Sequence, residues 1–112
     1  MFEAPTIGII GGSGWLGRSI ALAMLDKAFV QPDALVLSNR SASHPFANSR
    51  WSQVPVTHDN QALVRRCEVV ILSVRPEQFA DLQICAENRL VISLMAGVPL
   101  EDVARRTGSR QV

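Results

Sequence analysis

The chain has 112 residues, of which 47% are hydrophobic, and a formal net charge of +1. This length allows one compact core and little more. Ten of the eleven basic residues are scattered arginines, so no basic run marks a surface for nucleic acid or an anionic membrane. No apolar stretch approaches the roughly 20 residues of a membrane span, and no export signal opens the chain. We therefore expect one cytoplasmic domain that binds neither nucleic acid nor membrane.

The first apolar run, residues 6–10, leads into a glycine-rich turn. Gly12, Gly14 and Gly17 have the spacing G-x-G-x-x-G, and a helix is expected over residues 16–28. In such a turn the three glycines permit a tight bend, the approach of a pyrophosphate and close packing of helix on strand. Free N–H groups at the helix start would bind the pyrophosphate. The predicted dinucleotide site contains Gly12, Ser13, Gly14, Trp15, Leu16 and Gly17.

Five short apolar runs predict a sheet. They cover residues 6–10, 34–38, 54–57, 69–74 and 90–94. Their apolar character is continuous rather than alternating, which is typical of parallel strands covered on both faces. Segments that can form helices lie between them. We therefore predict an α/β fold of the Rossmann type, with a doubly wound, mainly parallel sheet cut off after five or six strands.

The segments between the strands carry helix signals. The first places Leu16, Ile20, Ala23, Met24 and Lys27 at helical spacing, which predicts an apolar stripe facing the sheet. Asp59 is expected to cap a helix over residues 60–66. Prolines suit the first turns of helices over residues 76–82 and 99–106, and Thr107-Gly108 is expected to end the last one. Residues 41–53 are interpreted as an irregular loop with at most a short helix.

The cysteines and histidines show no metal-ligand pattern. Cys67 and Cys85 are isolated and lie beside or within apolar segments, so we predict two buried free thiols. His44 and His58 have no Cys or carboxylate pattern around them, and we expect surface loop residues. The sequence predicts no metal site.

The end of the second strand predicts the choice of cofactor. An adenosine ribose bound at the glycine turn should meet this end, about 20 residues downstream. The sequence there is Ser38, Asn39, Arg40 and Ser41, without the acidic residue that commonly holds the ribose of NAD. Hydrogen-bond donors and a fixed positive charge suit a 2′-phosphate. We therefore predict that NADP(H) is the cofactor.

The ends of the fourth and fifth strands are expected to line the nicotinamide half of the cofactor. Ligands of open α/β sheets lie across the carboxyl ends of the strands. The fourth strand ends in Val74, Arg75 and Pro76, and the fifth is followed by Ala96 and Gly97. These five residues complete the predicted cofactor site.

With these segments in place, the chain resembles the N-terminal domain of pyrroline-5-carboxylate reductases over nearly all its length. Residues 57–60 resemble the T-x-D-N segment of that family, in which the Asn contacts the ribose phosphate, so the resemblance assigns this role to Asn60. Residues 67–76 are similar to A-D-V-V-x-L-A-V-K-P, and residues 90–97 to L-V-I-S-I-x-A-G. Residues 38–40 look like the corner of the family that selects NADP.

The chain also departs from the family pattern. Trp15 places a bulky ring where the family turn, G-A-G-N-M, has a smaller polar residue, and Arg75 replaces a Lys. The segment 41–53 carries Pro45 and Trp51 where the family tends to have a helix. These differences indicate a divergent relative.

The resemblance implies hydride transfer from NADPH to a cyclic imine, giving an amino acid such as proline. It also implies that residues 1–112 form the dinucleotide-binding domain of a homo-oligomeric protein. The substrate pocket and the dimer contacts would then lie on a helical domain after residue 112. We assign no catalytic residue to the present chain, and we expect it to have negligible reductase activity alone.

Three alternatives remain open from the sequence. One is another NADP-dependent oxidoreductase of related fold, including the deazaflavin (coenzyme F420)-dependent NADP reductases, whose turn can also read G-G-x-G. A second is a short-chain dehydrogenase, because Gly11, Gly14 and Gly17 spell G-x-x-G-x-x-G; residues 73–76 disfavour it, because they replace the N-A-G-type corner of that family. The third is a non-catalytic module that senses NADP(H).

Overall fold

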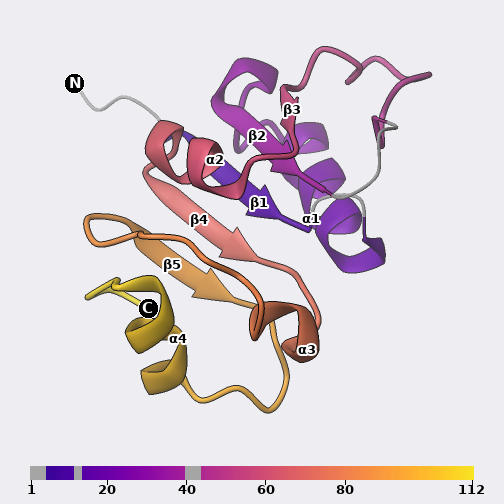
Figure 1. Cartoon of the computed structure of the whole chain (residues 1–112). Coiled ribbons are helices and arrows are strands. Elements are labelled where there is room, and N and C mark those ends of the chain that lie inside the picture. Colours follow the sequence, from indigo (N-terminus) through magenta and orange to yellow (C-terminus); the bar gives the residue numbers. More distant parts are fainter. Residues whose placement is uncertain (1–4, 12–13, 40–43) are drawn as a thin grey trace.

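A five-stranded sheet forms the centre of the computed structural model, which describes residues 5–11, 14–39 and 44–112. The strands are β1 (Ile7–Ile10), β2 (Leu35–Ser38), β3 (Val56–Thr57), β4 (Val69–Leu72) and β5 (Leu90–Ser93). All neighbouring strands are parallel, and their order is β3-β2-β1-β4-β5 (Figure 1). The predicted Rossmann-type α/β fold is therefore confirmed, and every strand has bounds within two residues of those expected.

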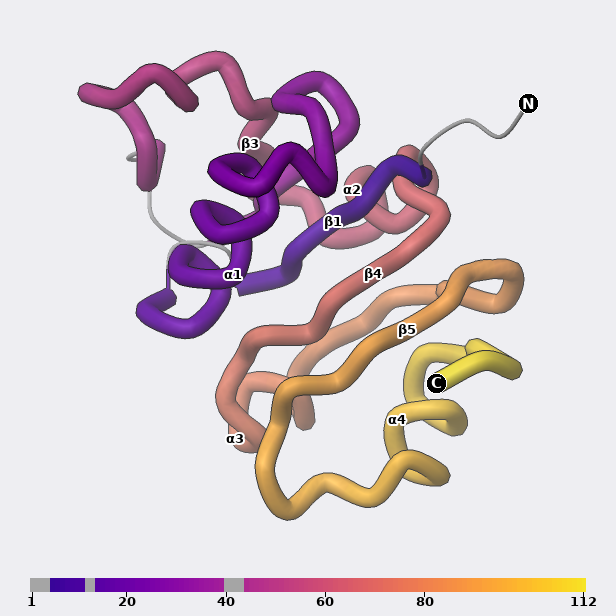
Figure 2. The backbone as a smooth tube through the Cα atoms, turned by 180° about the vertical axis from the view of Figure 1, so that it is seen from behind, coloured from indigo at the N-terminus to yellow at the C-terminus, as the bar shows by residue number. Residues whose placement is uncertain are grey.

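Helices cover both faces of this sheet, as the opposite views of Figures 1 and 2 show. They are α1 (Trp15–Asp26), α2 (Asn60–Arg66), α3 (Pro76–Phe79) and α4 (Leu100–Thr107), with a short 3-10 helix, η1 (Pro32–Ala34), before β2. In the part of the chain that the structure describes, no helix is long and apolar enough to cross a membrane.

Two apolar clusters fill the space between the sheet and the helices. The neighbouring residues Ile9 and Ile10 of β1 belong to different clusters, because successive side chains of a strand point to opposite faces. Ile9 shares its cluster with Ala21 and Leu25 of α1. The cluster of Ile10 contains residues of the other three helices, among them Leu63, Phe79 and Val103. The sheet is thus doubly wound, with α1 on one face and α2, α3 and α4 on the other.

The buried face of α1 differs from the predicted stripe. Gly17, Ala21 and Leu25 are the buried residues of this helix. Of the predicted stripe, Leu16, Ala23 and Lys27 are exposed, and Ile20 and Met24 are partly buried. The prediction followed the larger apolar side chains, whereas the close approach of the helix to the preceding turn decides the orientation. A Cβ atom on Gly17 would lie only 2.6 Å from the carbonyl oxygen of Gly11.

The ends of the other helices agree with the sequence signals except at α3. The Asp59 carboxylate accepts a hydrogen bond of 3.1 Å from the backbone N–H of Ala62 and caps α2 as predicted. Gly108, with φ of 73°, ends α4 in the left-handed conformation. The helix α3 ends at Phe79, three residues earlier than predicted, because the backbone then tightens into i→i−3 hydrogen bonds, such as that from Leu82 N–H to the Phe79 carbonyl.

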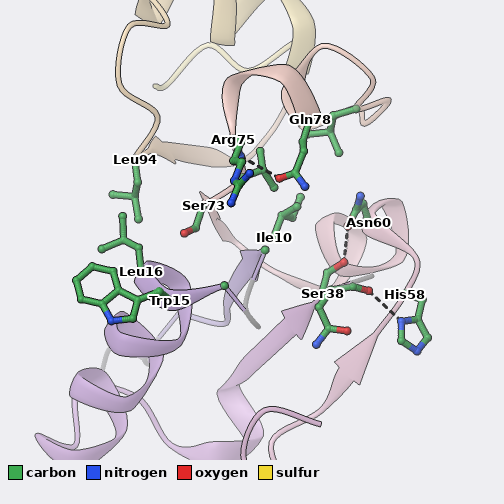
Figure 3. Close-up of a pocket in the computed structure, with 15 residues that line it drawn as sticks. Ile10, Trp15, Leu16, Ser38, His58, Asn60, Ser73, Arg75, Gln78 and Leu94 are labelled. Atoms are coloured by element: carbon green, nitrogen blue, oxygen red, sulfur yellow. Dashed lines mark hydrogen bonds between the residues drawn. The ribbon is translucent and has the colours of Figure 1, made fainter. Parts of the chain in front are cut away.

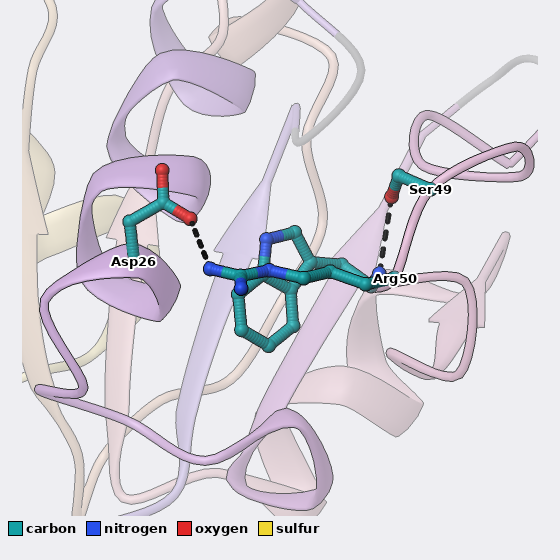
Figure 4. Close-up of polar contacts among 4 residues, drawn as sticks. Asp26, Ser49 and Arg50 are labelled. Carbon is teal, nitrogen blue, oxygen red and sulfur yellow. Dashed lines mark hydrogen bonds and ion pairs between the residues drawn. The ribbon is translucent and has the colours of Figure 1, made fainter.

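Residues 44–54 form a series of turns that packs beside α1, which agrees with the predicted irregular loop. Phe46 and Val54 are buried in the same cluster as the α1 side chains. The Arg50 guanidinium pairs with Asp26 of α1 at 3.1 Å and lies 4.3 Å from the centre of the Trp51 ring (Figure 4). Both ionic partners are exposed, so the ion pair contributes little, and the apolar contacts hold this segment in place.

The two cysteines have different environments. Cys67 is a buried free thiol, as predicted, but Cys85 is exposed, so the prediction for Cys85 was wrong. Cys85 lies in the irregular segment between α3 and β5, where its backbone N–H donates to the Gln61 side chain at 2.7 Å. The apolar residues around Cys85 in sequence therefore do not place its own side chain in the core.

We predict that Gly11→Ala lowers the free energy of unfolding by about 3 kcal/mol or more. Gly11 has φ of 89°, and a Cβ atom would collide with the carbonyl oxygen of Ser73. Gly108→Ala is the control, because Gly108 has φ of 73° but open space around it; it should cost only about 1 kcal/mol. Urea unfolding followed by circular dichroism measures both. Equal losses would show that the contact with Ser73 does not constrain the fold.

A second prediction concerns alkaline pH. Burial raises the pKa of the Cys67 thiol from 9.0 to about 11, and the charges of Arg66 and Arg89 only partly offset this. The folded state holds this proton more tightly than the unfolded chain does, so the stabilisation is complete below pH 9 and is lost as the pH rises toward 11.

Between pH 8 and pH 10, the free energy of unfolding of the wild type should fall by about 1 kcal/mol more than that of Cys67→Ala. Urea unfolding at both pH values tests this, and Cys85→Ala should behave as wild type; the same pH slope in Cys67→Ala would contradict it.

Candidate functional site

A cavity of about 890 Å³ lies at the carboxyl ends of the strands (Figure 3). Ile10 at the end of β1, Ser38 at the end of β2 and Ser73 just after β4 all line it. The strand order places β1 between β2 and β4, and the chain crosses from one side of β1 to the other. Such a switch point is where open α/β sheets bind their ligands.

The N-terminus of α1 opens onto this cavity. Gly11, Gly14, Trp15 and Leu16 line it. Gly14 is the N-cap residue of α1; no side chain among the described residues caps the helix, and its first turn carries no acidic residue. In contrast, α2 has the carboxylate of Asp59 in this place. The free N–H groups and the positive end of the helix dipole can therefore bind an anionic group in the cavity.

The structure brings together part of the predicted glycine turn. Gly14, Trp15 and Leu16 line the cavity, whereas Gly17 supports the turn from behind by its close approach to Gly11. The predicted Gly12 and Ser13 lie outside the described residues. The Trp15 side chain is 84% exposed and lies beside Leu16 at the rim (Figure 3). Trp15 thus lines the cavity with a largely exposed ring.

Polar residues from β2 and α2 form one side of the cavity. The Ser38 hydroxyl donates a hydrogen bond to the side-chain oxygen of Asn60, and Nδ1 of His58 lies 2.9 Å from the backbone carbonyl oxygen of Asn39 (Figure 3). Ser38, Asn39 and Asn60 are predicted site residues, and the structure places them together. Arg40 and Ser41 lie outside the described residues.

The side chain of Asn39 has no hydrogen-bond partner among the described residues. It is only 7% exposed, and neither its amide nitrogen nor its oxygen has a partner within the described part of the chain. A buried unpaired polar group costs about 1–3 kcal/mol. Asn39 lines the cavity, but both polar atoms of its amide are shielded from solvent, so the amide does not face a ligand there.

Residues that follow β4 and β5 form the other side of the cavity. Val74, Arg75 and Leu94 line the cavity, and Gln78 of α3 accepts a hydrogen bond of 3.0 Å from the backbone N–H of Arg75. The predicted site residues Pro76, Ala96 and Gly97 do not line it. Their assignment to the cofactor stays a prediction.

The charge around the cavity favours an anion. No Asp or Glu is found among its described lining residues, and Arg75 and His58 are the ionisable side chains there. Across residues 5–11, 14–39 and 44–112, no group of three or more His, Cys, Asp and Glu residues could hold a metal ion. The arrangement can bind phosphate groups and a polar ribose, but it offers no paired acid and base.

Several lining residues were missed by the sequence analysis. They are Ile10, Gly11, His58, Ser73, Gln78, Leu82 and Leu94. Ser73 could have been found from its place directly after β4, because ligands gather at strand ends. His58 was interpreted as a surface loop residue, and it is indeed exposed, but only the pairing of β2 with β3 brings it to the end of β2.

The parallel sheet, the glycine turn and the uncapped helix define a dinucleotide-binding domain of the Rossmann type. Residues 6–97 match the family model described as "NADP oxidoreductase coenzyme F420-dependent". The chain belongs to this family of NADP oxidoreductase domains, and it is related to the N-terminal NADP-binding domain of pyrroline-5-carboxylate reductases.

The relatives support this relationship. Pyrroline-5-carboxylate reductase 1 of Dictyostelium discoideum is 32% identical over 99 residues, which are 82% of this chain and 17% of the relative. The reductase of Synechocystis sp. is 30% identical over 88% of this chain and 38% of its own length. The chain thus spans well under half the length of the relatives it matches.

Solved structures agree in fold. The pyrroline-5-carboxylate reductase of Coxiella burnetii superposes with a TM-score of 0.78 at 25% identity, over 97% of this chain and 42% of that one. The Plasmodium falciparum enzyme, whose crystal structure has NADP bound, gives a TM-score of 0.75 over 99% of this chain and 41% of that one. Because the Plasmodium falciparum enzyme is only 18% identical to this chain, its similarity shows the fold alone.

Proposed function

We propose that the cavity binds NADP(H), and that the chain serves as the cofactor-binding domain of a pyrroline-5-carboxylate reductase-like oxidoreductase. The observation that carries this proposal is the uncapped N-terminus of α1, which opens onto a cavity without described carboxylates. A second sign of fit is the polar wall formed by Ser38, His58 and Asn60, which can meet a ribose or a phosphate group.

In this proposal, different residues bind different parts of the cofactor. The first-turn N–H groups of α1 hold the pyrophosphate. Asn60, oriented by its hydrogen bond with Ser38, and Asn39 contact the adenosine ribose. Arg40, which follows Asn39 in the chain, pairs with the 2′-phosphate and thereby favours NADP(H) over NAD(H).

The nicotinamide half of the cofactor would lie toward Leu16, Val74 and Leu94. These side chains exclude water and hold the ring in place, which is the contribution that a protein makes to cofactor chemistry. Bound NADPH supplies a hydride that can reduce the C=N bond of a cyclic imine. We assign the chain no catalytic residue, so its own part in the reaction is binding and orientation.

The substrate pocket is proposed to need residues that this chain does not contain. The matched relatives are more than twice as long as the matched part, since 103 aligned residues cover only 38% of the Synechocystis sp. reductase. We propose that a helical domain following residue 112 supplies the imine pocket and joins two copies into a homo-oligomer, in the cytoplasm. Proline formation is the corresponding pathway.

A second candidate function is hydride exchange between NADP and a deazaflavin. The observation that favours it is the description of the matching family, which names coenzyme F420. Both candidates require the same NADP(H) site and differ in the second substrate. Reduction of F420 by NADPH, or of pyrroline-5-carboxylate by NADPH, on a chain that carries the following domain separates them.

We predict that the chain binds NADPH about ten- to a hundred-fold more tightly than NADH, which is the effect of one charge-assisted hydrogen bond to the 2′-phosphate. Arg40→Ala should remove most of this preference, whereas Arg105→Ala, which changes an exposed arginine of α4, should leave it intact. Trp15 fluorescence and calorimetry measure the affinities. A folded chain that binds neither nucleotide overturns the proposed site; equal affinities overturn the role of Arg40.

The purified 112-residue chain should show negligible turnover of pyrroline-5-carboxylate, even when NADPH binds. The reason is that we place the imine pocket in the part of the relatives that this chain does not cover. NADPH oxidation followed by absorbance measures the rate, with the reaction without enzyme as the baseline. Turnover well above that baseline would show that the chain itself holds the substrate pocket.

A further inference from the structure

His58 lies at the end of the cavity that β2 and α2 form (Figure 3). It stands at the variable position of the T-x-D-N segment, to which the family resemblance assigns no role. We propose that His58 binds the 2′-phosphate of NADP(H) and so contributes to the discrimination against NAD(H). This inference rests on the proposed NADP(H) site and adds a specificity-determining residue to it.

The hydrogen bonding of the ring fixes which nitrogen faces a ligand. Nδ1 lies 2.9 Å from the backbone carbonyl oxygen of Asn39. A carbonyl only accepts hydrogen bonds, so Nδ1 carries the hydrogen. The second nitrogen, Nε2, has no partner among the described residues, and the ring is exposed at the cavity. Nε2 is therefore the atom that a ligand can reach.

The surroundings of His58 suit a phosphate at the ribose end of a nucleotide. Its hydrogen bond ties the ring to the backbone of Asn39, whose own side-chain amide is buried and lacks a described partner. The neighbouring Ser38 hydroxyl is already committed to Asn60. A phosphate, whose oxygens accept hydrogen bonds, suits the imidazolium form of His58, in which both ring nitrogens donate.

Charge strengthens this assignment. With Nδ1 bonded to Asn39, a positively charged His58 ring would give a phosphate at Nε2 a charge-assisted hydrogen bond. Asp59, the next residue, directs its carboxylate to the backbone N–H of Ala62 at 3.1 Å. Arg40 follows Asn39 in sequence and lies outside the described residues, and Arg75 lines the opposite side of the cavity. NAD(H) lacks the 2′-phosphate, so its binding should not depend on this contact.

Affinities for NADPH and NADH in wild type, His58→Gln and His58→Phe test the proposal. His58→Gln and His58→Phe should each weaken NADPH binding about tenfold, the size of one charge-assisted hydrogen bond. Both should leave NADH binding unchanged within about twofold. Calorimetry at pH 7 measures the affinities for both nucleotides in wild type and in both variants.

The outcomes separate this inference from the proposed function. If wild type prefers NADPH and both variants keep that preference, His58 is not a phosphate ligand and the NADP(H) site itself stands. If His58→Gln weakens both nucleotides equally and His58→Phe restores them, the ring stacks on adenine and the inference is overturned. If wild type binds neither nucleotide, the proposed function and this inference fail together.

Discussion

The structure depends on the close approach of three backbone segments at the carboxyl end of β1. Gly11 adopts φ of 89° directly against the carbonyl group of Ser73, which follows β4, and Gly17 of α1 packs with its Cα against the carbonyl of Gly11. No side chain fits between these segments. This contact brings the N-terminus of α1 to the junction of β1 and β4, so its free N–H groups face the cavity. The same constraint explains why α1 buries small residues, Gly17 and Ala21, rather than its larger apolar ones.

A second constraint joins β2 to α2. Ser38 is only 2% exposed and directs its hydroxyl to Asn60, while the backbone of Asn39 binds the His58 ring. These polar groups lie at the end of a sheet whose interior is apolar, where a buried polar atom destabilises the fold unless it is paired. Ser38 and Asn60 satisfy each other, but the Asn39 amide does not find a described partner. Both atoms of this amide are shielded from solvent, so an amide without a described partner lies beside the cavity.

The sequence predicted the sheet well because strands covered on both faces leave continuous apolar runs, and β1, β2 and β4 have only buried or partly buried residues. The cap of α2 at Asp59 and the end of α4 at Gly108 followed from local chemistry in the same way. Properties that depend on contacts across the chain were not accessible. The orientation of α1 is decided by backbone contact rather than by side-chain hydrophobicity, and Cys85 turns outward from an apolar stretch of sequence. His58 and Leu94 reach the cavity only because the strand order gathers distant strand ends at one edge.

The departures of the chain from its relatives fall unevenly around the cavity. On the side of β2, Ser38, Asn39 and Asn60 retain the family pattern and line the cavity. On the opposite side, Arg75 takes the place of a lysine, and Trp15 adds an exposed ring beside Leu16 at the rim (Figure 3). The Trp15 ring is 84% exposed, so it adds apolar surface to the rim of the cavity. In the proposed binding mode, the retained side holds the adenosine phosphate and the altered side meets the nicotinamide and its reaction partner. In this binding mode, the divergence leaves cofactor binding in place and alters what approaches the cofactor, because a planar guanidinium and an indole ring present a different surface from an ammonium and a small polar side chain.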